Sequence, residues 1–351
     1  MQVNPAHHNV PKRYEKSVKL KNMKVLLTGA TGFLGYRTLE KLVNLDNVEH
    51  IKATGRVLKN THKVDHPKVE YKLGDLTDPL FVEALMTEVD CVIHAAALSS
   101  PWGKREAFVK ANVISQINLI DAGKKNSIKK YIFISTPSMY FEIKDKFNIK
   151  ESDPLPEKFI NAYAETKRMA EIALEESGIP YVILRPRALT GRGDNVIMPR
   201  LIRAYDEGKL KVIGDGENIA DLTSVANVAD AIILSLNANE KGINNTYNIT
   251  NGAPVKLWDS IADVLRKLDK EPPIKKIPFW IVKITAQLME LKSKATNMKE
   301  PTLTKYGVGT LAKSLTMDIS KAKNLLKYEP KVSTEEAIDE FVKWYKKNEK
   351  N

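Results

Sequence analysis

The sequence predicts an α/β protein built on a doubly wound parallel sheet, with a smaller α/β unit interleaved with it. Apolar runs typical of buried strands alternate with segments of helical periodicity through about residue 250. The first apolar run, "MKVLLT" at 23–28, ends at a glycine-rich turn that a helical pattern follows. A parallel sheet needs this order, because a crossover between parallel strands usually carries a helix.

The composition is that of a globular protein in a reducing compartment. Of its 351 residues, 43% are hydrophobic and 28% are charged, which suffices for one large or two modest domains. The single cysteine, Cys91, lies in an apolar run and excludes an intramolecular disulfide framework. No apolar stretch reaches the length of a membrane span, and the N-terminus lacks the apolar core of a secretion signal. We therefore expect a cytoplasmic protein.

The net charge of +12 does not indicate nucleic-acid binding, because the lysines are scattered and no RNA-binding motif occurs. We expect no nucleic-acid partner. Many lysines collect at the two ends, and residues 1–22 show no periodicity, so this segment is predicted to be a flexible tail ahead of Met23. Attraction to anionic metabolites or a weak contact with a membrane surface stays open.

The turn after the first strand, "TGATGFLG" at 28–35, predicts a nucleotide-binding site. Between a strand and a helix, glycines allow a tight turn and the close approach of a pyrophosphate, and the helix N-terminus offers N–H groups to the phosphates. A plain glycine-rich turn is the alternative. The predicted contacts are Gly29, Thr31, Gly32, Phe33, Leu34 and Gly35.

The second strand, at 48–56, ends in Gly55 and Arg56, with no carboxylate to bind the adenosine ribose. An Asp or Glu at this point accepts from the free 2′-hydroxyl of NAD, whereas a guanidinium suits a 2′-phosphate. We therefore predict NADP(H) in preference to NAD(H). The alternative for Arg56 is a solvated surface arginine.

The third and fourth strands also end at chemically informative positions. "VEYKLGDLTD" at 69–78 gives a third strand and then Asp75, ahead of a helix start at Thr77, Asp78 and Pro79. "VDCVIHAAALSS" at 89–100 ends in small residues. His94 lies inside this apolar run and is interpreted as a packed histidine rather than an acid–base group.

The fifth strand and the helix after it predict redox chemistry on a carbonyl group. "KKYIFISTPSMY" at 129–140 ends in hydroxyl side chains, and Tyr163 and Lys167 share one face of the next helix. Ketone reduction needs a proton donor, and a nearby ammonium lowers the phenol pKa from about 10 toward the working range. A hydroxyl at the strand end can hold the carbonyl oxygen.

With these motifs, the chain resembles the extended short-chain dehydrogenases, which have a Rossmann sheet, from Met23 to about residue 345. The resemblance implies that Tyr163 is the acid–base group, Lys167 modulates its pKa, and Thr136 anchors the substrate oxygen. It also implies that Asn112 holds the active-site helix and its water, and that Tyr163 and Lys167 contact the cofactor. No metal is expected.

The resemblance further implies how cofactor, domains and subunits are arranged. The implied cofactor contacts are Asp75 and the Leu76 amide at the adenine, Ala95, Ala96 and Ala97 at the sheet edge, and Pro186 and Ala188 at the nicotinamide. Residues 23–188 plus 221–250 form the expected NADP-binding domain, and residues 189–220 plus 251–347 the substrate-binding domain. A homodimer is expected through the helices at 108–123 and 162–176.

The later part of the chain indicates the substrate class. Ala220 precedes Asp221 where nucleotide-sugar epimerases usually carry a diphosphate-binding arginine. This stretch and residues 300–338 resemble the 3β-hydroxysteroid dehydrogenase-like branch, above all its bacterial 2-alkyl-3-oxoalkanoate reductases and then sterol-4-carboxylate dehydrogenases.

The expected function is NADPH-linked interconversion of a ketone and a secondary alcohol on a hydrophobic substrate of 3-oxoacyl or 3β-hydroxysteroid type. The alternatives are a nucleotide-sugar epimerase, dehydratase or reductase, and a non-catalytic NADP-binding regulator. The apolar segment at 277–294 is predicted to be a helix packed over the substrate domain; a wall for acyl or steroid entry that touches lipid is the alternative.

Overall fold

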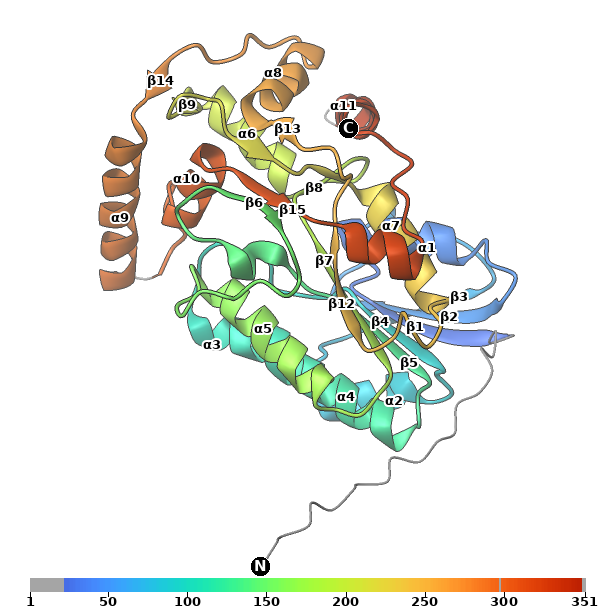
Figure 1. Cartoon of the computed structure of the whole chain (residues 1–351). Helices are drawn as coiled ribbons and strands as arrows, with labels where there is room; N and C mark the ends of the chain where they lie inside the picture. Colours follow the sequence, from blue (N-terminus) through green and yellow to red (C-terminus); the bar gives the residue numbers. More distant parts are fainter. Residues whose placement is uncertain (1–21, 297, 349–351) are drawn as a thin grey trace, which may run out of the picture.

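The predicted parallel sheet is confirmed in the computed structural model, which describes residues 22–296 and 298–348 (Figure 1). Seven parallel strands lie in the order β12-β7-β5-β4-β1-β2-β3. They are β1 (Met23–Thr28), β2 (Val48–Gly55), β3 (Val69–Leu73), β4 (Cys91–His94), β5 (Lys130–Ile134), β7 (Tyr181–Pro186) and β12 (Asn245–Ile249). The strand order reverses between β1 and β4, and this reversal opens a crevice at the carboxyl ends of these strands.

Helices cover both faces of the sheet, because successive strand residues point to opposite sides. Leu27 of β1 and Ile93 of β4 enter one apolar core, and their neighbours Leu26 and Val92 enter the other. On the first face lie α1 (Phe33–Leu42) and α7 (Val225–Leu236). On the second lie α2 (Pro79–Met86), α4 (Ser115–Lys125) and α5 (Ala162–Glu175). Between β4 and α4 come α3 (Arg105–Phe108) and the π-helical segment η2 (Val109–Ile114).

A second, smaller unit lies beyond the carboxyl edge of the large sheet. Its sheet has the order β13-β10-β15-β6, and two two-stranded sheets accompany it. These strands are β6 (Lys146–Ile149), β8 (Leu189–Thr190), β9 (Val212–Ile213), β10 (Ile219–Ala220), β11 (Thr223–Ser224), β13 (Val255–Lys256), β14 (Lys276–Ile277) and β15 (Leu315–Met317). The accompanying helices are α6 (Ile197–Asp206), α8 (Leu257–Lys267), α9 (Phe279–Ala295), α10 (Lys305–Ala312) and α11 (Thr334–Asn348).

Two segments cross the predicted division between the domains. Strand β6 pairs with β15 in the small sheet, although it belongs by sequence to the first unit. Ile319, Ala322 and Tyr328 come from the C-terminal part of the chain and pack in the core of the large sheet. The two units are therefore joined by shared core packing as well as by the chain.

Residues 1–21 of the predicted tail lie outside the described residues. Within residues 22–296 and 298–348, no helix has the length and apolar character needed to cross a bilayer. Cys91 is a buried free thiol, and burial raises its pKa to about 12.

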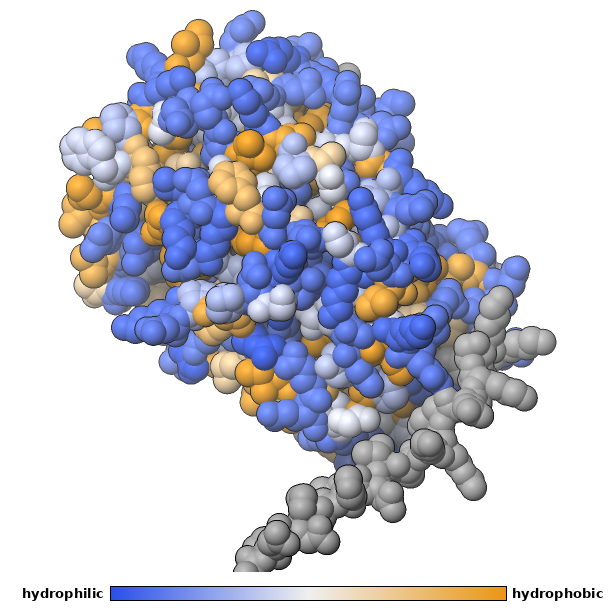
Figure 2. All heavy atoms as spheres, in the orientation of Figure 1, coloured by the Kyte–Doolittle hydropathy of each residue, from blue (hydrophilic) through white to orange (hydrophobic). Residues whose placement is uncertain are grey.

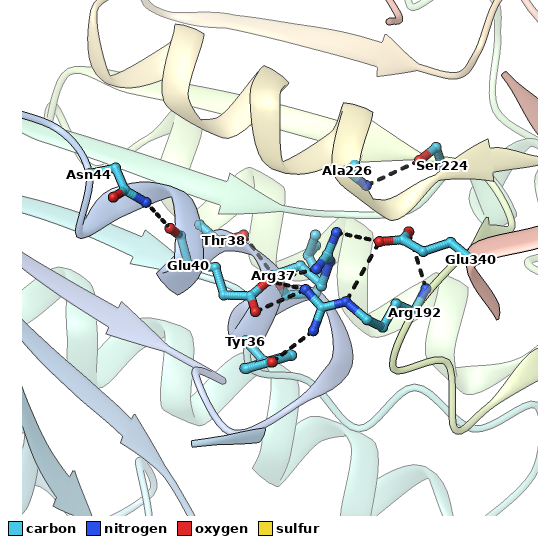
Figure 3. Close-up of polar contacts among 10 residues, drawn as sticks. Tyr36, Arg37, Thr38, Glu40, Asn44, Arg192, Ser224, Ala226 and Glu340 are labelled. Carbon is cyan, nitrogen blue, oxygen red and sulfur yellow. Dashed lines mark hydrogen bonds and ion pairs between the residues drawn. The ribbon is translucent and has the colours of Figure 1, made fainter. Parts of the chain in front are cut away.

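An ion-pair network ties the small unit to α1 (Figure 3). Arg192, in the loop after β8, places one guanidinium nitrogen 2.6 Å from Glu40 and another 2.8 Å from the Tyr36 hydroxyl. Glu340 of α11 accepts from Arg37 at 2.9 Å and lies 3.6 Å from the Arg192 Nε. The network thus fixes both the loop at 191–194 and the C-terminal helix to the first helix of the large sheet.

Candidate active site

The glycine turn after β1 is built by two glycines that leave no room for a side chain. A Cβ on Gly29 would lie 2.6 Å from the Ala96 nitrogen, and one on Gly35 would lie 2.0 Å from the Gly29 oxygen. Gly29 also has a φ of +69°, which other residues rarely adopt. Gly32 differs, because a Cβ there would meet only the Gly29 oxygen, at 3.3 Å. Gly32 therefore borders open space in which a ligand can approach the backbone.

Helix α1 begins at this turn with an unblocked positive end. Its N-cap, Gly32, offers no side-chain cap, and its first turn carries no acidic residue. The first amides of a helix have no intrahelical acceptor, so Phe33 and Leu34 present N–H groups and positive potential to the crevice. Gly193, from the loop that Arg192 anchors, lies close to the Phe33 ring, because a Cβ added to it would be 3.4 Å from the ring. The arrangement suits the predicted pyrophosphate contact.

The end of β2 explains why position 55 is glycine. A Cβ on Gly55 would lie 2.2 Å from the Thr31 Oγ1, so the threonine side chain fills the space that a ribose-binding carboxylate would need. The next residue, Arg56, is exposed and makes no hydrogen bond or ion pair with the residues that the structure describes. Thr31 thus packs against β2, and Arg56 is the side chain available to a 2′-phosphate.

Asp75 and the residues at the end of β4 line the same edge. The Asp75 Oδ1 accepts from the Thr77 amide at 2.9 Å, and this bonding, with smaller contributions from Lys110 and Arg56, lowers the pKa of Asp75. The Leu76 carbonyl accepts from Asn118 at 3.0 Å. Residues 95–97 are half-buried or exposed at the crevice.

His94 is packed, as the apolar run predicts. Its Nδ1 lies 2.6 Å from the Thr28 hydroxyl, and its ring stacks on Phe133 with centroids 5.5 Å apart. Burial, with a smaller contribution from Lys167, holds the pKa of His94 well below its usual range. The ring is therefore neutral at physiological pH.

Tyr163 and Lys167 both reach the carboxyl end of β5. Helix α5 begins just before Tyr163, because the Asn161 side chain caps it by accepting from the Ala164 amide at 2.9 Å. Lys167 is 1% exposed and donates to the Ile134 carbonyl at 2.6 Å. One helix face thus carries a phenol and an ammonium to the end of one strand.

Of the hydroxyls at this strand end, Thr136 is the one whose interaction with the Tyr163 phenol lowers the pKa of that phenol. Thr136 also donates to Ser138 at 3.0 Å, and the Ser138 hydroxyl lies 2.8 Å from that of Tyr306. The Ser135 hydroxyl is buried and makes no hydrogen bond with the residues that the structure describes. Tyr306 comes from α10 of the small unit, and no motif in the sequence indicated that it reaches the site.

The pKa of the Tyr163 phenol differs from the expectation. Burial raises the pKa of Tyr163 to about 12, although its hydrogen bond with Thr136 opposes the rise. The sequence predicted that Lys167 lowers this pKa, but the ammonium is held at the Ile134 carbonyl instead. Burial also lowers the pKa of Lys167 to about 7, with a smaller opposing contribution from Glu171.

Asn112 positions the active-site helix through a fully used amide group. Its Oδ1 accepts from the Leu98 amide at 2.7 Å, and its Nδ2 donates to the Leu98 carbonyl at 3.2 Å and to Thr166 at 3.1 Å. Both amide hydrogens therefore have acceptors. Asn112 joins the loop after β4 to the residue preceding Lys167.

Arg187 is a second residue that the sequence analysis missed. It follows Pro186 at the end of β7, is 7% exposed, and its Nε has no hydrogen-bond partner. Within residues 22–296 and 298–348 its guanidinium makes no hydrogen bond or ion pair, and Asp221 is the charged group that it influences. A buried cation without direct partners is costly, so it marks a position where an anion can bind.

Asp221 is preceded in the chain by Ala220, in place of the arginine that nucleotide-sugar epimerases usually carry. Ala220 is buried in β10, between β13 and β15. Asp221 accepts from the Met317 amide at 2.7 Å, and burial raises its pKa to about 6, with Met317 and then Arg187 opposing. The nearby Ala188, predicted to lie at the nicotinamide, has a φ of +40° and accepts from the Thr223 amide at 2.9 Å.

With this geometry in view, the relatives of the chain are informative. The profile described as "NAD dependent epimerase/dehydratase family" matches residues 25–250. The chain belongs to this family. Its members include the extended short-chain dehydrogenases, so the resemblance that the motifs indicated is confirmed.

Two relatives and one solved structure indicate how far the likeness extends. A 3beta-hydroxysteroid-dehydrogenase/decarboxylase isoform 1 of Arabidopsis thaliana is 31% identical, over 90% of this chain and 78% of the relative. A 2-alkyl-3-oxoalkanoate reductase of Shewanella oneidensis is 30% identical, over 89% and 84% respectively. A UDP-glucuronic acid 4-epimerase from Bacillus cereus, solved in complex with NAD, shares the fold with a TM-score of 0.71, at 24% identity and 93% and 99% coverage.

The lowered pKa of Lys167 predicts a stability that rises with pH. In the folded protein its pKa is about 7 against a usual value of 10.5, so between these values the unfolded chain binds the extra proton. The free energy of unfolding of wild type, relative to Lys167→Met, should therefore rise by up to about 1.4 kcal/mol per pH unit.

Urea unfolding of both proteins without cofactor, at several pH values from neutral upward, measures this difference. If the difference in free energy of unfolding between wild type and Lys167→Met stays constant with pH, the pKa of Lys167 is not lowered in the folded protein. Arg266→Ala, on the exposed surface of α8, serves as a control for loss of one positive charge.

Proposed function

We propose that the chain is an NADP(H)-dependent oxidoreductase that interconverts a ketone and a secondary alcohol on a hydrophobic substrate. The observation that carries this proposal is the meeting of Thr136, Tyr163 and Lys167 at the end of β5. This set lies at the same sheet edge as the uncapped N-terminus of α1. A dinucleotide that spans the crevice between them would bring its reactive ring to the phenol.

Thr136, Tyr163 and Lys167 would each have a separate role in the reaction. A nicotinamide bound here supplies or accepts the hydride. Thr136 and Tyr163 offer two hydroxyls to the substrate oxygen, and Tyr163 gives it a proton during reduction. Because the pKa of Tyr163 is about 12, its hydroxyl is protonated at neutral pH, which suits the reductive direction. Lys167, once charged, can donate hydrogen bonds to sugar hydroxyls of the cofactor.

The cofactor assignment has two supports. The family is described as NAD dependent, and the Bacillus cereus relative was solved with NAD. For this chain we propose NADP(H), because Arg56 stands exposed at the end of β2 and Thr31 occupies the place of a carboxylate. The adenine would then lie near Asp75 and Leu76.

For the substrate we propose a 3-oxo acid or a 4-carboxylated steroid-like ketone. The names of the relatives, an oxoalkanoate reductase and a 3beta-hydroxysteroid-dehydrogenase/decarboxylase, fit this class. Arg187 supports it in this chain, because its guanidinium is buried without a direct partner at the strand end next to Thr136. One bidentate guanidinium suits a carboxylate, whereas a diphosphate would also draw on the arginine that Ala220 replaces.

The other functions have weaker support. A nucleotide-sugar epimerase shares the fold, but Ala220 offers no cation to a diphosphate. A regulator that only binds the cofactor has no need of a phenol, an ammonium and a hydroxyl brought together. The homodimer stays a prediction; Ile114, Ile117 and Ile172, on the helices expected to pair, are each 38–40% exposed.

Replacing the phenol tests the reaction. Tyr163→Phe should lower the turnover of ketone reduction by about 10²-fold or more, because it removes the proton donor and leaves the ring in place. The cofactor dissociation constant should change little, which fluorescence titration measures. Reduction at a normal rate in this variant would place the active site elsewhere.

Removing the arginine of β2 tests the cofactor. Wild type should prefer NADPH over NADH by about 10- to 10³-fold, and Arg56→Ala should bring this ratio close to one by weakening NADPH alone. Dissociation constants for both cofactors at one ionic strength measure it, since part of the effect is screened by salt. Arg266→Ala, which removes an equal charge from α8, should leave the ratio unchanged. A wild type that already prefers NADH would contradict the assignment.

Neutralising the buried guanidinium tests the substrate. Arg187→Met should raise the KM for a 3-oxo acid by about 10- to 100-fold, because a charge-assisted pair is lost. The KM for the matching neutral methyl ketone should stay within about threefold of wild type, since this substrate has no carboxylate. Equal losses on the two substrates would assign Arg187 to the fold alone.

A further inference from the structure

Helix α9 has apolar side chains on two opposite faces, and only one of them is packed. Val282 and Ala286 are buried against the core of the small unit. The sequence predicted a helix packed over this unit, and for this face the prediction agrees with the structure. The other face is exposed, and its apolar residues are Trp280 (64% exposed), Ile281 (39%), Ile284 (50%), Leu288 (61%) and Leu291 (56%).

The spacing of the exposed residues makes them one stripe. Trp280, Ile284, Leu288 and Leu291 recur at intervals of four, four and three, which keeps them on one side of a helix. The buried positions 282, 286 and 293 lie on the opposite side. Figure 2 shows hydrophobic side chains gathered along the edge of the molecule where α9 lies.

Basic side chains flank this stripe without acidic ones among them. Lys283, Lys292 and Lys294 of α9 are exposed. The helix has one acidic residue, Glu290, which is 7% exposed and accepts from the Lys305 amide at 2.7 Å. Just before the helix, Ile274 is 91% exposed, and Lys275 and Lys276 follow it in the chain.

We propose that α9 docks on an anionic membrane surface and lies in the plane of the lipid headgroups. An apolar stripe with lysines on its flanks matches such a surface, because the stripe enters the acyl boundary while the ammonium groups meet lipid phosphates. A second copy of the chain fits less well. A twofold contact through this face would set the lysines of one copy against those of the other, in a protein of net charge +12.

The docked helix would lie beside the candidate active site. Trp102 donates its indole N–H to Ser293 of α9 at 3.0 Å, and the Lys294 ammonium lies 5.8 Å from the Trp102 ring. Trp102 belongs to the loop that follows β4, whose first part Asn112 holds at Leu98. Membrane docking would therefore bring a hydrophobic substrate from the bilayer to this side of the site. That consequence rests on the proposed function, whereas the docking itself does not.

Vesicle sedimentation with the full chain tests the docking. Wild type should sediment with vesicles of phosphatidylcholine mixed with phosphatidylglycerol, and several-fold less with phosphatidylcholine alone. The double variant Ile284→Ser, Leu288→Ser should bind the mixed vesicles at least about tenfold more weakly, since two side chains of the stripe no longer enter the lipid. Lys283→Glu with Lys292→Glu should lose the preference for anionic lipid.

A matched control separates the stripe from other exposed apolar residues. Leu80→Ser on α2 with Phe147→Ser on β6, two exposed apolar residues outside α9, should leave vesicle binding unchanged. Circular dichroism should show the same fold in every variant, because all the altered side chains are exposed. Equal losses in both serine variants, or no sedimentation of wild type with the mixed vesicles, would overturn the proposal.

Two further measurements keep the alternatives apart. If light scattering shows that the Ile284→Ser, Leu288→Ser variant loses an oligomer that wild type forms, the stripe is an interface between copies and the lipid proposal is wrong. Reduction of a short, water-soluble ketone should be equal in wild type and this variant. Vesicle binding without any ketone reduction would leave the docking intact and overturn the proposed function alone.

Discussion

The close crossing of β1, α1 and the end of β4 is the constraint on which the rest of the structure depends. Gly29 and Gly35 let the helix begin against the strand, at a separation that a single Cβ would exclude. This contact sets the N-terminus of α1 at the carboxyl edge of the sheet. The same helix then carries Tyr36 and Glu40, to which Arg192 anchors the small unit. The close packing at these glycines thus positions the N-terminus of α1 and also the helix to which the small unit is anchored.

The part of the crevice at Tyr163 and Lys167 is held in place by hydrogen bonds, whereas the glycine turn is held by close packing. Asn112 spans from the loop after β4 to Thr166, so the strand end and α5 keep a fixed separation. Within that frame Lys167 is held by the Ile134 carbonyl. Burial opposes charge on both titratable groups, because it raises the pKa of Tyr163 and lowers that of Lys167. Hydrogen bonds to the hydroxyls of a bound ligand would favour the charged lysine, so such binding would be coupled to proton uptake at Lys167.

Local pattern sufficed for much of the fold and of the site, and failed where packing between distant segments decides. The strand at 23–28, the glycine turn, and Tyr163 with Lys167 on one helix face follow from neighbouring residues. The reach of Tyr306 into the site depends on how α10 packs, and no periodicity records it. In α9 the sequence shows broad apolar surface but cannot say which face is buried. The raised pKa of Tyr163 likewise follows from burial, which the spacing of two residues does not reveal.

The three arginines of "RPRALTGR", residues 185–192, differ in whether a carboxylate pairs with them. Arg185 is buried against Glu171 at 2.6 Å, and Arg192 lies between Glu40 and Glu340. Both pairs compensate the desolvation of a cation, so these two residues stabilise the fold. Arg187 stands between them in sequence and is buried like Arg185, yet no carboxylate makes an ion pair with it within the described residues. A guanidinium keeps its charge at every physiological pH, and the Asp221 carboxylate compensates that of Arg187 only through space. Arg187 can therefore also pair with a bound anion, which is why we propose a carboxylated substrate at this strand end.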